Sequence, residues 1–179
     1  MRCTSVTDTL LARQGTSVDP DDVAPVSVAD AARAAWQHVD TAQAQLRNEA
    51  TRVVVAAEPR LHQLFENLIR NAVEHGGAGV TVTVGDLDGG FYVEDDGAGL
   101  SGADPDRLFE SGYTTASEGT GFGLSIVEEI VDAHGWTVSA TEEGTGGIRF
   151  EIRDVESPPD SKTTGDDAES STSAEPTSD

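Results

Sequence analysis

The order of helical and strand-like periodicity along residues 26–153 constrains the fold of this 179-residue chain most strongly. A helix, two strands, a helix, two strands, a glycine-rich stretch, a helix and two strands follow one another. Pairs of strands joined by short turns favour antiparallel pairing, whereas a doubly wound parallel sheet needs a helix between strands. We therefore predict an α+β fold, a two-layer sandwich in which helices cover one face of a mixed, mainly antiparallel sheet.

The boundaries of these elements follow from capping signals and from glycine and proline positions. The predicted helices span residues 27–38, 59–75 and 119–134, with a short helix at 105–110, and the predicted strands span residues 44–47, 51–56, 79–84, 91–95, 136–141 and 147–153.

The formal charge of −22 excludes several classes of function. Proteins that bind nucleic acids or anionic membranes place basic surface against phosphates, so neither class of partner is expected. No apolar run approaches the roughly 20 residues that span a bilayer, and no charged-plus-apolar leader opens the chain. We expect a cytoplasmic protein without direct membrane insertion, although a full-length parent could be membrane-attached.

The acidic residues are not evenly distributed, and this predicts three regions. Residues 1–25 resemble the end of a helix followed by a linker, and residues 26–153 keep the apolar periodicity of a folded domain. Residues 154–179 are rich in serine, threonine and acidic side chains, which predicts a disordered tail. The acidity of the folded part is typical of a shell that keeps a protein soluble in concentrated salt.

The predicted helix 59–75 carries a polar row at the border of its apolar face. Asn67, Asn71 and His75 follow i, i+4 spacing, which places them in one half-sheltered line. Such a row can face a ligand, and it is equally the pattern of an ordinary polar flank. Glu66 lies about 100° away around the helix and is expected to be a solvated surface residue.

A carboxylate ends the predicted strand 91–95 on its apolar face. Phe91, Val93 and Asp95 share this face because side chains alternate along a strand. A buried carboxylate needs hydrogen-bond donors. Asp95 is therefore expected either to cap the following loop or to contact a ligand.

Three glycines precede the last predicted helix. Gly119, Gly121 and Gly123 do not match the spacing of a dinucleotide-binding turn, and a P-loop is excluded because the one lysine, Lys162, lies in the tail. A glycine-rich turn at a helix N-terminus can still seat a phosphate group. Alone, this signal is weak.

Four motifs in a fixed order are far more specific than any of them alone. Asn67-x3-Asn71-Ala72, Asp95-x-Gly97-x-Gly99, the segment from Phe109 to Thr114, and Gly119-x-Gly121-x-Gly123-Leu124 follow one another. This order resembles the N, G1, F and G2 boxes of the ATP-binding catalytic domain of sensor histidine kinases, which has a Bergerat-type fold. The sequence of residues 66–75 and the acidic composition look most like those of a haloarchaeal histidine kinase.

The resemblance implies an ATP site between the asparagine helix and a short mobile lid. It implies that Asn71 ligates Mg²⁺, that Asp95 accepts from the adenine amino group, and that Gly97 and Gly99 let the backbone approach the base. The other residues that the resemblance places around the nucleotide are Asn67, Glu74, His75, Leu100, Tyr113, Thr114, Gly119, Thr120, Gly121, Phe122, Gly123 and Leu124.

Asn67 is also the candidate catalytic residue. ATP-hydrolysing relatives have a water-activating glutamate at this place, so the amide predicts phosphate delivery to a side chain rather than efficient hydrolysis. Glu74 stands where many family members carry a basic residue. In the absence of lysine, Mg²⁺, backbone N–H groups or an arginine such as Arg70 or Arg107 must neutralise the phosphates.

The expected phosphate acceptor is absent from this sequence. None of the four histidines is followed by an acidic residue, which usually accompanies the acceptor. We therefore expect the catalytic half of a two-component histidine kinase, whose partners are a dimerisation region that carries the acceptor histidine and, through it, a response regulator. One alternative is a non-catalytic nucleotide-binding or interaction module. A second alternative is a serine kinase of the anti-sigma type, although the amide at position 67 argues against it.

Overall fold

The computed structural model describes residues 18–99, 108–109, 123–142 and 146–159, and these residues form a sheet covered by helices. The main sheet has five strands in the order β2-β4-β5-β7-β6. β2 pairs with β4 in parallel, and the other three pairings are antiparallel. The strands are β2 (Gln45–Asn48), β4 (Thr81–Leu87), β5 (Gly90–Asp95), β6 (Thr137–Glu142) and β7 (Ile148–Arg153).

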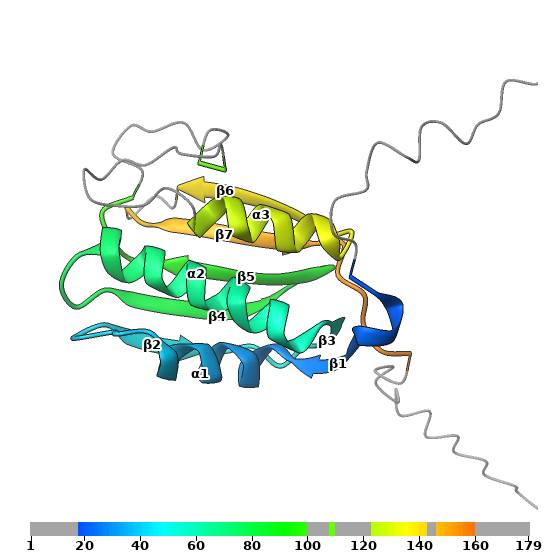
Figure 1. Cartoon of the computed structure of the whole chain (residues 1–179). Coiled ribbons are helices and arrows are strands. Elements are labelled where there is room, and N and C mark those ends of the chain that lie inside the picture. The colour runs from blue at the N-terminus through cyan, green and yellow to red at the C-terminus, as the bar shows by residue number, and fades with distance from the viewer. Residues whose placement is uncertain (1–17, 100–107, 110–122, 143–145, 160–179) are drawn as a thin grey trace, which may run out of the picture.

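Three helices lie side by side over one face of this sheet (Figure 1). They are α1 (Val28–His38), α2 (Glu58–Gly76) and α3 (Gly123–Ala133), and α2 packs between the other two. A short 3₁₀ helix, η3 (Pro20–Asp22), precedes them. The predicted α+β class with a mixed, mainly antiparallel sheet is confirmed.

A second, two-stranded sheet was not anticipated. β1 (Ala24–Ser27) pairs antiparallel with β3 (Val53–Ala56), so the strands at 45–48 and 53–56 belong to different sheets. Where the chain leaves the main sheet, the Asp86 carboxylate on β4 accepts from the backbone N–H groups of Thr51 (2.9 Å) and Arg52 (3.1 Å). Burial alone would raise the pKa of Asp86, but these bonds and the Thr51 hydroxyl hold it below its ordinary value.

α2 organises the core. Its predicted limits are confirmed within one residue, because a proline occupies its first turn and Gly77 (φ +88°) ends it. The ring of Phe65 meets that of Phe91 on β5 at 5.4 Å between centroids. Burial of each large apolar side chain contributes about 1.5–3 kcal/mol. The residues that α2 buries are Leu61, Leu64, Phe65, Asn67, Leu68, Ile69 and Ala72.

The hairpin of β4 and β5 determines which residues of β5 face the helices. Leu87 pairs with Gly90 across a two-residue turn, and Gly89 takes φ +75°, which favours glycine. This register buries Phe91, Val93 and Asp95, as the strand alternation predicted.

The predicted short helix at 105–110 lies largely outside the described residues. Within it, Leu108 is buried and the ring of Phe109 packs edge-on against Phe150 of β7 at 6.2 Å. Among the described helices, none combines the length and the apolar character needed to cross a membrane.

Candidate functional site

Three segments named by the sequence motifs meet at one end of the helical layer. The C-terminal end of α2, the loop after β5 and the start of α3 lie at the same end of the sheet (Figure 1). A Cβ atom on Gly97 would overlap the Cα atom of Gly76, so the loop and the end of α2 are in backbone contact. Oδ1 of Asn67 lies 3.6 Å from where a Cβ on Gly123 would be.

Asp95 is a buried carboxylate in this region, with 7% of its surface exposed. Its Oδ1 accepts from the backbone N–H of Gly97 at 2.9 Å, and the backbone N–H of Ile148 also donates to it. Burial nevertheless raises the pKa of Asp95 above its ordinary value. The loop-capping role is therefore present, and because a carboxylate has about four acceptor positions, it keeps capacity for a further donor.

The asparagine row on α2 is placed as the helical spacing predicted. Asn67 is buried, and its Nδ2 donates to the carbonyl of Gln63 at 2.8 Å, which leaves Oδ1 for another partner. Asn71 and His75 are half-buried, whereas Glu74 is exposed. The row is thus partly sheltered, and Asn67 within it faces the start of α3.

Glycine positions explain how closely the backbone packs here. Gly99 takes φ +68°, and a Cβ on it would lie 2.6 Å from Oε1 of Glu142. Gly147, which sequence reasoning did not single out, lies against the carbonyl of Asp95, and a Cβ there would overlap it. The Gly146-Gly147 pair before β7 is the signal that could have identified this contact.

Part of the motif set lies outside the described residues. Gly123 and Leu124 open α3 and are half-buried. The predicted nucleotide contacts that lie outside the described residues are Leu100, Tyr113, Thr114, Gly119, Thr120, Gly121 and Phe122, together with the candidate phosphate ligand Arg107.

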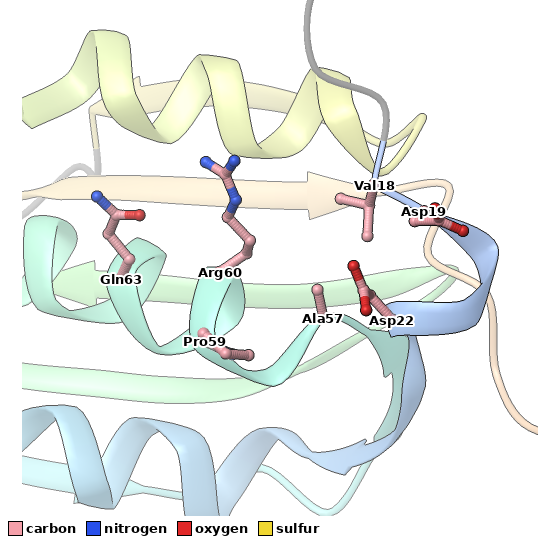
Figure 2. Close-up of a pocket in the computed structure, with 7 residues that line it drawn as sticks. All are labelled: Val18, Asp19, Asp22, Ala57, Pro59, Arg60 and Gln63. Carbon is pink, nitrogen blue, oxygen red and sulfur yellow. The ribbon is translucent and has the colours of Figure 1, made fainter.

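A separate open cavity of about 570 Å³ lies at the opposite end of α2. Figure 2 shows Arg60 and Gln63 projecting from the first turns of this helix toward α3. A 19-residue helix is about 28 Å long, so this cavity is remote from Asp95. Its lining residues are Val18, Asp19, Asp22, Ala57, Pro59, Arg60 and Gln63.

The chain is similar to known proteins in both sequence and fold. It is 35% identical over 118 residues to the sensor histidine kinase ZraS of Escherichia coli K12, covering 62% of this chain and 25% of ZraS. It thus spans about a quarter of the length of that relative. A mycobacterial sensor histidine kinase, MprB, superposes with a TM-score of 0.64 at 20% identity, covering 76% of this chain and 99% of that one.

Full-length ShkA, solved in complex with AMPPNP, superposes with a TM-score of 0.63 at 26% identity, covering 80% of this chain and 33% of ShkA. Residues 56–157 match the family described as histidine kinase-, DNA gyrase B- and HSP90-like ATPase, which is more than half of the chain. The chain therefore belongs to this family of histidine kinase-, DNA gyrase B- and HSP90-like ATPases.

Proposed function

We propose that this domain binds Mg·ATP and transfers the γ-phosphate to a histidine on a separate acceptor region. The bond between the γ-phosphorus and the bridging oxygen of ADP breaks, and a phosphorus–nitrogen bond to the acceptor imidazole forms. The observation that carries the proposal is the buried Asp95 carboxylate beside the end of α2.

Asp95 suits recognition of the adenine amino group. A carboxylate whose burial raises its pKa gains from each additional N–H donor, because the donor stabilises its charged form. An exocyclic amine supplies such a donor without adding a formal charge. The backbone contact of Gly97 with Gly76 holds the loop and the helix together on one side of this carboxylate.

The two asparagines suit phosphate chemistry. Asn71 is half-buried, and its amide oxygen is a neutral ligand of the kind that Mg²⁺ accepts together with waters. Asn67 is buried one turn earlier, and an amide there cannot act as a general base toward water. The terminal phosphate would therefore remain available for a side chain.

The family membership and the named relatives support this activity. ZraS is named as a sensor histidine kinase, and ShkA was solved with an ATP analogue. We propose that the acceptor region and a response regulator complete the pathway, and that residues 26–153 form the catalytic unit between a linker and an acidic tail. We also propose that the protein comes from a haloarchaeon and that its acidic surface is an adaptation to high salt.

The test combines the domain with a separately produced dimerisation hairpin that carries an acceptor histidine, in the presence of γ-labelled ATP. We expect label on the hairpin that is lost in acid and absent when its histidine is replaced by alanine. Asn71→Ala should lose transfer, whereas Asp96→Asn, an exposed control, should keep it.

Two other outcomes would contradict the proposal, and the experiment distinguishes them. Acid-stable label would indicate a serine kinase. Nucleotide binding without any label on several acceptor hairpins would indicate a non-catalytic module.

A further inference from the structure

A cluster of metal-ligand side chains lies between α1 and α2, on a different side of α2 from Asn67. His38 is the last residue of α1, and His62 and Glu66 are one turn apart on α2. One candidate ligand atom from each residue lies within 4.8 Å of the others. The two imidazole rings meet edge-to-face at 5.1 Å between centroids.

The hydrogen bond of His38 fixes which nitrogen is free. Its Nδ1 lies 2.8 Å from the backbone carbonyl oxygen of Ala34. A carbonyl only accepts, so in the neutral ring Nδ1 carries the proton and Nε2 keeps its lone pair. Metal-ligating histidines have this arrangement, in which a carbonyl orients the ring through the other nitrogen.

His62 and Glu66 differ from an ordinary surface ion pair. Nδ1 of His62 lies 3.6 Å from Oε1 of Glu66, which is longer than a normal hydrogen bond. Nε2 of His62 is buried and has no hydrogen-bond partner among the described residues. The Glu66 side chain is 27% exposed, so this residue is partly sheltered at the surface where the sequence predicted a solvated surface residue.

We propose that His38, His62 and Glu66 bind one divalent transition-metal ion of the zinc class. Two imidazoles and a carboxylate suit Zn²⁺, with water in the fourth position, whereas Mg²⁺ prefers oxygen ligands alone. Zn–N bonds of about 2.0–2.1 Å require the most separated donors to approach one another. The exposed His38 and the half-exposed Glu66 can make this adjustment by side-chain rotation.

The site would join two helices that are separated by two strands along the chain. α1 and α2 already pack along one another, and the ion would cross-link the end of α1 to the middle of α2. Because the unfolded chain does not hold these ligands together, binding stabilises the folded state. Asn67 faces the start of α3 instead, so this site and the nucleotide site are separate.

The experiment titrates the full chain with Zn²⁺ alone by calorimetry, with Cys3→Ser in every variant to remove the thiol. We expect one ion per chain and a melting temperature that rises with Zn²⁺. Loss even of an outer partner of a metal ligand costs about 10–100-fold in affinity. His38→Gln and Glu66→Gln should therefore weaken binding at least about tenfold and abolish the rise in melting temperature.

Glu58→Gln is the matched control, because it removes the same charge from an exposed position on the same helix. It should bind Zn²⁺ as the parent chain does. Melting temperatures in chelator verify that each variant is folded. Equal Zn²⁺ affinity in the parent, His38→Gln and Glu66→Gln, or no binding by the parent, overturns the proposal.

Discussion

Asp95 places a carboxylate in surroundings that disfavour its charged form. The folded state raises its pKa through burial, and two backbone N–H groups offset only part of this cost. Its burial follows from strand alternation, which is visible in the sequence. The contact of Gly97 with Gly76 was not predictable, because it joins the loop to the end of α2, a segment distant in the sequence.

Asp95→Asn should stabilise the domain in the absence of nucleotide at pH 7. The raised pKa means that the folded state holds a proton more tightly than the unfolded chain does. The penalty is fully present above the folded pKa and disappears as the pH falls through it, so the advantage of the variant should shrink on acidification. Urea unfolding at pH 7 and near pH 4.5 measures this. An advantage that grows in acid would contradict the assigned burial cost.

At the scale of the elements, His134 links α3 to the start of α2. Its Nδ1–H donates to the carbonyl of Ile130 (2.8 Å), and its Nε2 accepts from the N–H of Ala57 (3.1 Å), which precedes α2. The ring also stacks on Trp136 at 4.3 Å. Burial is the main cause that lowers the pKa of His134. The imidazole is therefore neutral in the folded domain at pH 7.

His134→Ala should destabilise the domain at pH 8 by about 1–3 kcal/mol, because the buried Ala57 N–H loses its acceptor. A histidine whose pKa is raised on folding stabilises the protein at low pH, and the lowered pKa of His134 has the opposite effect. The stability from His134 is present above the unfolded pKa of about 6.5 and is lost as the pH falls through the folded pKa. The difference in unfolding free energy between parent and variant should thus narrow from pH 8 to pH 5. A constant difference would exclude this linkage.

Sequence periodicity predicted some elements and not others, for physical reasons. α2 and the two long hairpins were predictable, because a wide apolar stripe or a strict alternation specifies both type and buried face. The four-residue strands β1, β2 and β3 carry too little pattern to specify partners. Between β2 and β3, the backbone N–H groups of Thr51 and Arg52 donate to Asp86 on β4, and no local sequence pattern predicts such long-range contacts.

For the whole molecule, the charge of −22 remains the dominant property. One arginine can contact several acidic side chains. Arg149 bridges Glu94 (3.0 Å) and Glu151 (3.1 Å) and lies 3.8 Å from the ring centre of Tyr92. The remaining acidic side chains repel one another, and this repulsion opposes the compact state.

Raising KCl from about 0.1 M to about 1 M should raise the melting temperature. The Debye length falls from about 10 Å to about 3 Å, which screens the repulsion. A gain of about 1 kcal/mol corresponds to roughly 2–4 °C for a chain of this size. Thermal melts in KCl, with sorbitol as an osmolyte control, measure this. A melting temperature that falls with KCl would contradict the proposed salt-adapted shell.

The central claim is that Asp95 recognises the nucleotide, and calorimetric titration of Mg·ATP tests it most directly. A hydrogen bond to a charged group contributes about 1.5–3 kcal/mol, or roughly 10–100-fold in affinity. Asp95→Asn should therefore bind at least about tenfold more weakly than the parent, whereas the neighbouring exposed Asp96→Asn should bind equally well. Equal affinity of the parent and Asp95→Asn, or no binding by the parent, would contradict the account.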